Sequence, residues 1–154
     1  MNAITAILRD SPKRFVGDKA AIARVRCVLM RADRYLLAQH NSRRRDTIGQ
    51  WGLPGGRLKD DEKPKAALRR EIFEELGCRV PGLIRLGDWM YRHEQQRVFG
   101  CEIDNPIAKF DADELRAIGW FSYAEIIELA RGRKLRMGFE LAAIIEFQRR
   151  IADA

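Results

Sequence analysis

Hydrophobic and polar residues alternate along the early part of the chain in the pattern of a strand. Within residues 21–30, every second side chain is apolar, whereas Arg24 and Arg26 fall on the opposite side. The turn-like "ADR" separates this segment from residues 35–39, which predict the second strand of a hairpin. We expect further strands over residues 82–92, 96–104 and 115–121.

Residues 64–76 have the periodicity of a helix. Leu68, Ile72 and Leu76 recur at every fourth position, so they would form one apolar stripe that packs on a core. Gly77 suits the C-terminal cap of this helix, because glycine readily adopts the left-handed conformation found there.

Two more helices are expected toward the C-terminus. Ser122 would cap the first, with Glu125 as its capping-box partner, and residues 138–151 have the pattern of an amphipathic helix. This mixture of elements predicts an α+β fold with a mixed β-sheet sandwiched between α-helices. We expect residues 1–154 to form a single domain, with residues 1–20 as an N-terminal extension that could add a strand.

Composition narrows the class of protein. The 154 residues suffice for a buried core, and 46% hydrophobic with 33% charged residues is typical of a globular protein. No apolar run approaches the ~20 residues that span a bilayer, and we identify no signal peptide, so no membrane association is expected. Cys27, Cys78 and Cys101 are odd in number and widely spaced, which favours a reducing cytoplasm over a disulfide framework.

The formal net charge of +7 suggests an anionic ligand. The basic residues are spread along the chain, so we do not expect nucleic acid as the primary ligand. A nucleotide-sized anion fits the same charge.

Three glutamates, Glu71, Glu74 and Glu75, crowd one part of the predicted helix. Spacings of three and four residues place them on neighbouring positions of its surface, where like charges repel. A solvated helix face is the ordinary interpretation of such a group. The alternative is a site for a hard divalent cation, which prefers carboxylate oxygens and would remove the repulsion.

The segment around this helix resembles the Nudix hydrolase box, from Gly56 to Cys78. The residues that match its fixed identities at the right spacing are Gly56, Glu62, Arg70, Glu71, Glu74, Glu75 and Gly77. The flanking segments also look like the family, so most of residues 20–130 is compatible. Two positions depart from the pattern: Cys78 replaces a branched apolar residue, and Lys63 is a poor helix cap because its charge opposes the helix dipole.

The resemblance implies a Nudix fold and a catalytic metal site. The groups expected to hold Mg²⁺, or alternatively Mn²⁺, are the backbone carbonyl of Gly55 and the carboxylates of Glu71, Glu74 and Glu75. Arg70 belongs to the same catalytic set, and its expected role is structural: it would pair with Glu62 and tie the loop to the helix.

The reaction implied by the resemblance is hydrolysis of the diphosphate linkage in a nucleoside diphosphate joined to another group X, such as a nucleoside diphosphate sugar or ADP-ribose. One alternative is a nucleoside triphosphate pyrophosphatase that releases pyrophosphate. A second is a non-enzymatic nucleotide-sensing or RNA-binding module on the same scaffold, which the presence of all three glutamates disfavours.

The general base is expected to be a carboxylate that accepts a proton from the attacking water. Glu71 is the leading candidate. A later segment could supply the base instead, and the carboxylates available there are Glu94, Glu102, Asp111, Asp113 and Glu114.

Substrate recognition is expected outside the box. Arg26 could bind phosphate or sugar, and so could Arg45 within the basic run Arg43–Arg45, although that run could equally be a solvated loop. Trp51 and Tyr91 could stack on a nucleobase, although aromatic side chains more often serve the core. The sequence leaves a homodimer open.

Overall fold

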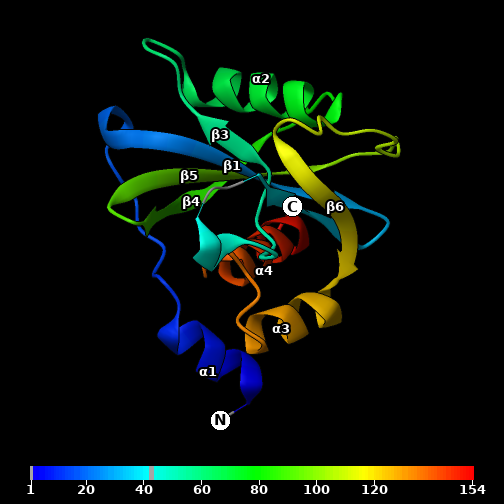
Figure 1. Cartoon of the computed structure of the whole chain (residues 1–154). Coiled ribbons are helices and arrows are strands. Elements are labelled where there is room, and N and C mark those ends of the chain that lie inside the picture. The colour runs from blue at the N-terminus through cyan, green and yellow to red at the C-terminus, as the bar shows by residue number, and fades with distance from the viewer. Residues whose placement is uncertain (1, 42–43) are drawn as a thin grey trace.

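A computed structural model describes residues 2–41 and 44–154 of the chain (Figure 1). The elements, in chain order, are α1 (Ala3–Asp10), β1 (Ile22–Arg31), β2 (Arg34–His40), β3 (Gly55–Arg57), α2 (Pro64–Leu76), β4 (Ile84–Tyr91), β5 (Glu94–Glu102), β6 (Leu115–Ser122), α3 (Tyr123–Arg131) and α4 (Glu140–Ala152). Short 3₁₀ turns cover Lys19–Ala21 and Arg45–Thr47. The predicted strands and helices are confirmed, with ends that shift by at most two residues, and the Ser122–Glu125 capping box is present.

The sheet is mixed, with the strand order β4-β5-β1-β2-β6. Strands β1 and β5 run parallel, and the other neighbours run antiparallel. Strand β1 shares its second edge between two partners, because β2 pairs with Met30 and Arg31 whereas β3 pairs with residues 24–26. Strands β2 and β3 thus lie along different parts of the same edge of β1, and α2 is the next helix in the chain after β3.

Helix α2 covers one face of the sheet (Figure 1). Its Leu68 and Ile72 are fully buried and pack in one cluster with Val25, Cys27 and Leu29 of β1. These are the apolar stripe of the helix and the apolar side of the strand that the sequence predicts. Burying a large aliphatic side chain contributes about 1.5–3 kcal/mol, so this packing fixes which faces of α2 remain available for chemistry.

Helices α3 and α4 lie on the opposite face (Figure 1). Ile126 of α3 and Phe147 of α4 are buried in a second cluster that contains Val28 and Met30 of β1. The sheet is therefore enclosed between helices, as predicted.

The N-terminal extension differs from the expected extra strand. Residues Ala3–Asp10 form helix α1, which the Asn2 side chain caps by accepting a hydrogen bond from the Thr5 backbone N–H. The only strand-like contact of this extension within the described residues is an isolated bridge between Phe15 and Asp88. The prediction of a strand is wrong because a local cap and an amphipathic stretch favour the helix.

Strand β3 is also absent from the sequence prediction, which takes its Pro- and Gly-rich segment as irregular. Gly55 has a φ of 145°, and an added Cβ would lie 2.0 Å from the Val25 carbonyl oxygen. Because glycine has no Cβ, this backbone can approach β1 closely enough to pair with it.

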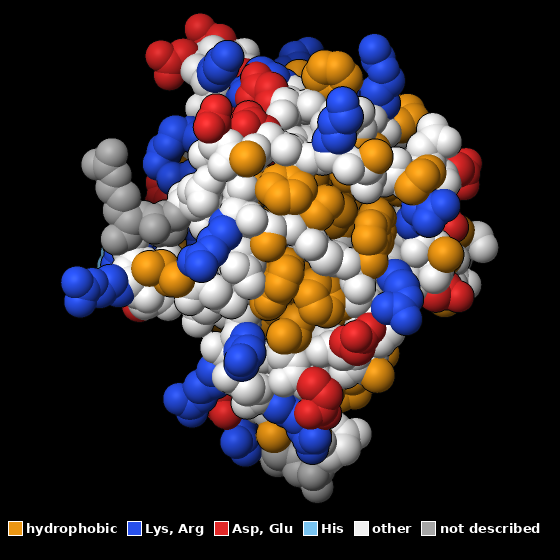
Figure 2. Space-filling view, turned by 45° about the vertical axis from the view of Figure 1, so that its right-hand side comes forward, with side chains coloured by type: hydrophobic (Ala, Val, Ile, Leu, Met, Phe, Trp, Pro, Cys, Tyr) orange, Lys and Arg blue, Asp and Glu red, His pale blue; other side chains and the backbone are white. Residues whose placement is uncertain are grey.

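Hydrophobic side chains also gather at the centre of the face shown in Figure 2, with lysines and arginines around them. Strand β6 forms one edge of the sheet, and its Ile118, Trp120 and Phe121 are half-buried. A homodimer stays a prediction.

In the described part of the chain, no helix combines the length and the apolar character that crossing a membrane requires.

Candidate active site

Arg70 ties the loop that precedes α2 to the helix itself. Its Nε and Nη2 atoms donate to the two oxygens of Glu62 at 2.8 and 2.9 Å, and Nη2 also donates to the Arg57 carbonyl at 3.1 Å. The Arg70 hydrogen bonds lower the pKa of Glu62 to about 2, and the same contacts raise the pKa of Arg70. The pairing implied by the sequence resemblance is confirmed.

Glu75 is the most buried of the three box glutamates, with 3% of its side chain exposed. One carboxylate oxygen accepts the Gly55 backbone N–H at 3.1 Å, and the other lies 3.5 Å from His40 Nε2. Burial raises the pKa of Glu75 to about 8; the charge of Arg26 opposes this shift, and the charge of Glu71 adds to it. Glu75 is therefore held by the first residue of strand β3, and the charges of both Arg26 and Glu71 act on it.

Glu71 occupies the space that a side chain at Gly56 would need. A Cβ on Gly56 would lie 2.4 Å from the Glu71 Cδ atom. Arg70 Nη1 donates to Glu71 at 3.0 Å and to Glu74 at 3.3 Å, so one guanidinium lies between these two carboxylates. Glu74 is 52% exposed, compared with 17% for Glu71.

No group of three or more His, Cys, Asp or Glu side chains among the described residues is arranged to hold a metal ion. The Arg70 guanidinium, which lies between the carboxylates of Glu71 and Glu74, separates Glu74 from the other two glutamates. The ligand atoms nevertheless suit a hard divalent cation in kind, because Glu71 and Glu75 both bring carboxylate oxygens to Gly55 and Gly56 at the start of strand β3. Burial raises the pKa of Glu75 and repulsion from Glu71 adds to that shift; a cation would relieve this repulsion. The residues present therefore fit the group that the sequence implies.

The alternative general bases differ in their relation to this site. Glu94 pairs with Arg24 at 3.0 Å and with Arg57 at 2.9 Å, and Glu114 is near enough for its charge to raise the pKa of Glu75. The backbone N–H of Asp111 donates to the Glu75 carbonyl, whereas its carboxylate accepts the backbone N–H of Asp113. Glu102 instead lines a hollow at the far end of α2, beside Gly77 and Cys78. The assignment of Glu71 as the general base stays a prediction.

A basic pocket of about 270 Å³ lies beside the box, and we call it the arginine pocket. Its lining residues are Arg24, Arg26, Arg44, Tyr91, Arg92, Glu94, Gln96 and Arg136. They come from β1, the loop after β2, the β4–β5 hairpin, β5 and the loop before α4. Strand alternation places Arg24 and Arg26 on one side of β1, and Gln96 is the parallel neighbour of Arg24.

The expected substrate-binding residues divide between this pocket and other places. Arg26 and Tyr91 line the pocket. Arg45 is exposed on a 3₁₀ turn and does not line it, and Arg43 lies outside the described residues. Trp51 also does not line the pocket; its half-buried ring packs edge-on against Phe121 with ring centroids 4.8 Å apart.

Several buried polar groups near the site were not predicted. Gln96 and Glu140 are fully buried, Arg136 is half-buried, and His40 lies against Glu75. Burial raises the pKa of Glu140 to about 7; burial also lowers the pKa of His40 well below its usual value, and Arg26 adds to that effect. Strand alternation could have indicated the side of β5 on which Gln96 lies. No local signal links residues 136 and 140 to the box, because the fold alone brings them there.

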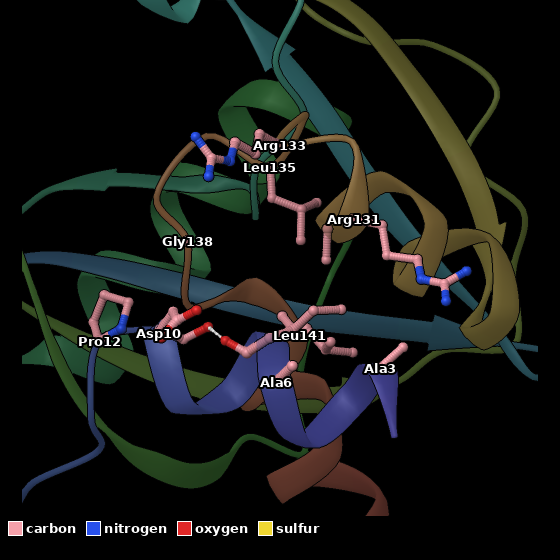
Figure 3. A pocket seen from close by; sticks show the side chains of 12 residues that line it. Ala3, Ala6, Asp10, Pro12, Arg131, Arg133, Leu135, Gly138 and Leu141 are labelled. Atoms are coloured by element: carbon pink, nitrogen blue, oxygen red, sulfur yellow. Dashed lines mark hydrogen bonds between the residues drawn. The ribbon is translucent and has the colours of Figure 1, made fainter. Parts of the chain in front are cut away.

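A larger hollow of about 560 Å³ lies between α1 and the segment from Ala130 to Leu141 (Figure 3). Arg131 and Arg133 are on one side of it, and Ala3, Ala6 and Asp10 of α1 are on the other. Figure 1 shows α1 and α2 at opposite ends of the molecule, so this hollow is far from the box glutamates. We therefore take the box glutamates and the smaller arginine pocket, whose Arg26 is the strand neighbour of Gly55, as the candidate active site.

Comparison with known proteins places these features in context. The NUDIX domain model matches residues 21–139. An RNA pyrophosphohydrolase of Bartonella tribocorum is 38% identical over 61 residues, which cover 39% of this chain and 35% of that protein. A MutT-like protein of Streptomyces ambofaciens is 34% identical over 105 residues, which cover 66% of this chain and 64% of that protein. The matches thus span between about a third and two thirds of these curated relatives.

Solved structures share the fold. The NUDIX domain of Shewanella oneidensis NrtR, complexed with ADP ribose, superposes with a TM-score of 0.70 over 98% of this chain and 99% of that chain. The sequence identity is 18%, so this likeness concerns the fold alone.

Proposed function

Because this chain belongs to the NUDIX domain family, we propose that it hydrolyses the diphosphate linkage of a nucleoside diphosphate joined to another group X. The observation that carries this proposal is the position of two carboxylates, Glu71 and Glu75, against Gly55 and Gly56 at the start of strand β3. The adjoining arginine pocket supplies positive charge for a phosphate chain.

The residues of the site have distinct tasks in this reaction. A bound divalent cation would neutralise charge on the diphosphate and lower the pKa of the attacking water. Glu71 accepts the proton of that water, and Arg70 holds its carboxylate in place through the 3.0 Å hydrogen bond. Glu75 is fixed by the Gly55 N–H, so its oxygens keep their position at the start of strand β3. Arg26, next to Glu75, faces negative charge on the substrate.

A nucleoside triphosphate pyrophosphatase is the second candidate. One relative is named an RNA pyrophosphohydrolase, which supports a substrate that loses pyrophosphate. The NrtR structure contains ADP ribose, and this ligand belongs to the first class. A nucleotide sensor without turnover is the third candidate, and the complete set of box glutamates argues against it.

Product analysis tests these candidates. The purified chain is incubated with Mg²⁺ or Mn²⁺ and a panel of nucleoside diphosphate sugars, ADP-ribose and nucleoside triphosphates, and products are identified by mass spectrometry. The first candidate gives a nucleoside monophosphate and phospho-X, whereas the second gives a monophosphate and pyrophosphate.

Glu75→Gln should abolish turnover, because it removes a carboxylate from the start of strand β3 while its amide oxygen can still accept the Gly55 N–H. Glu128→Gln, a change to an exposed residue of α3, is the matched control and should retain it. Equal turnover in the two variants would refute the assignment of the site. Tight nucleotide binding with no product from any member of the panel would support the sensor.

A further inference from the structure

His40 lies beside Glu75 but outside the box. It is the last residue of β2, and Leu36 and Ala38 precede it on the same side of that strand. Both are fully buried in the cluster on which α2 packs, so strand alternation carries the His40 imidazole to the face of the sheet that holds the box helix. The His40 side chain is only 12% exposed.

The two ring nitrogens of His40 are buried and have no hydrogen-bond partner within the described residues. Nε2 lies 3.5 Å from a carboxylate oxygen of Glu75, which is longer than an ordinary N–H···O hydrogen bond. An unpaired buried polar atom costs about 1–3 kcal/mol. The imidazole and the carboxylate thus lie side by side without a direct bond that would offset this cost.

The spacing of these two atoms suits a shared metal ion. Two atoms that bind one ion at about 2.1 Å each lie roughly 3.0 Å apart in an octahedral site and roughly 3.4 Å apart in a tetrahedral site. The 3.5 Å between His40 Nε2 and Glu75 Oε2 is close to these separations. Glu75 Oε1 accepts the Gly55 N–H, so Oε2 is the oxygen left for a cation.

Glu71 can supply a further oxygen. Its carboxylate lies against Gly56, and its charge acts on Glu75. Arg70 holds Glu71 through the 3.0 Å hydrogen bond, and no group of three such side chains among the described residues is already arranged around one point. A bound cation would therefore begin at the His40–Glu75 pair and draw Glu71 toward it.

We propose that His40 is a nitrogen ligand of the metal site, so that this site selects a first-row transition ion such as Mn²⁺ over Mg²⁺. The box glutamates offer only oxygen, which suits Mg²⁺ and Mn²⁺ alike, whereas an imidazole nitrogen suits transition ions and is a poor ligand for Mg²⁺. The inference rests on the metal site of the proposed function and is independent of the identity of the substrate.

The wild-type chain tests the ligand without substrate and without a variant. Chelator-treated protein is loaded with Mn²⁺, and pulsed electron paramagnetic resonance detects the modulation from any ¹⁴N nucleus bound to the ion. The chain has two histidines, His40 and His93, so labelling histidine with ¹⁵N shows whether an imidazole is the ligand. We expect ¹⁴N modulation that changes to the ¹⁵N pattern on labelling. Bound Mn²⁺ without histidine nitrogen would overturn the inference.

Two matched variants then identify the histidine. His40→Gln replaces the imidazole with an amide, and His93→Gln makes the same change at the exposed histidine between β4 and β5. The nitrogen modulation should vanish in His40→Gln and persist in His93→Gln. Persistence in His40→Gln would overturn the assignment.

Metal affinity, measured by isothermal titration calorimetry, separates a ligand from a positioning residue. His40→Gln should weaken Mn²⁺ binding about tenfold or more, since loss of even an indirect partner of a ligand typically costs about 10–100-fold in metal affinity. Mg²⁺ binding should stay nearly unchanged, and His93→Gln should match wild type for both ions. An equal loss for Mn²⁺ and Mg²⁺ would mean that His40 only positions Glu75, and would overturn the ligand assignment.

The outcomes also separate this inference from the proposed function. If bound Mn²⁺ has a histidine nitrogen but no nucleotide is hydrolysed, the His40 ligand stands and the hydrolase function fails. If a nucleotide is hydrolysed and bound Mn²⁺ has no nitrogen ligand, the hydrolase function stands and the inference is overturned. If His40→Gln does not fold, the labelling result on the wild-type chain decides.

Discussion

Gly56 should be essential for activity because its missing side chain makes room for Glu71. In Gly56→Ala, the new Cβ would lie 2.4 Å from the Glu71 Cδ atom and 2.5 and 2.7 Å from its two oxygens. Ordinary contact begins near 3.4 Å, so the carboxylate must withdraw by about 1 Å. A misplacement of about 1 Å at a reacting group can cost on the order of 10²-fold in rate.

The assay is the steady-state kcat of the best substrate, measured together with thermal melting. Gly82→Ala is the matched control, because nothing lies within 4 Å of its added Cβ. Both changes restrict the unfolded chain equally, so a difference between them reports the native site. We expect kcat to fall about 10²-fold only in Gly56→Ala, with a folded protein in both cases.

The refuting result would be a folded Gly56→Ala protein with the kcat of Gly82→Ala. Activity would then not depend on where the Glu71 carboxylate lies, and the assignment of Glu71 as base and ligand would be wrong. Loss of folding in Gly56→Ala would instead contradict the premise that the flexible Glu71 side chain can yield.

Two further outcomes are expected. Glu62→Gln should lower the free energy of unfolding at pH 7 by roughly 1–2 kcal/mol, because the pKa of Glu62 falls from 4.5 to about 2 and its side chain is partly screened at the surface. Because the pKa is depressed in the folded state, the ion pair contributes its full stability above about pH 4.5 and loses it as the pH falls toward 2. The free energies of unfolding of the two proteins, measured with urea, should therefore converge over this pH range. A constant difference between them would contradict the ion pair. Millimolar Mg²⁺ should raise the melting temperature more than Na⁺ at equal ionic strength. At a hundredfold excess over its Kd, the bound cation would add up to ~2.7 kcal/mol to the free energy of unfolding. Identical responses to the two salts would mean simple screening.

The box could be predicted from sequence through its resemblance to the Nudix hydrolase box, because its residues lie close together in the chain. Leu68 and Ile72 set the buried face of α2, and this fixes the direction of Glu71 and Glu75 without knowledge of the rest of the chain. Glu74 shows the limit of such reasoning. Helical spacing groups it with the other two glutamates, but the structure leaves it 52% exposed beside Arg70.

The arginine pocket could be predicted only in part, because it depends on contacts between distant segments. Alternation along β1 identifies Arg26, but its partner Gln96 is 70 residues away. Arg136 lies in a loop whose sequence carries no signal for the site. Trp51, an attractive base-stacking residue in the sequence, packs instead on Phe121.

The missing cap at Lys63 affects how helix α2 moves. Lys63 forms no side-chain cap, Pro64 has no N–H, and the first backbone bond of the helix runs from Ala67 N–H to the Lys63 carbonyl at 2.9 Å. The N–H groups of Lys65 and Ala66 are thus left to water, and both residues are exposed. Hydrogen exchange should therefore be rapid at these two amides and slow from Ile72 onward.

The opposite end of α2 is closed, because Gly77, at a φ of 63°, donates to the Phe73 carbonyl. Fraying of this helix then starts at the end far from Glu71 and Glu75, and the Arg70–Glu62 pair stands between the two. We therefore expect the first turn of the helix to open locally while the carboxylates keep their places.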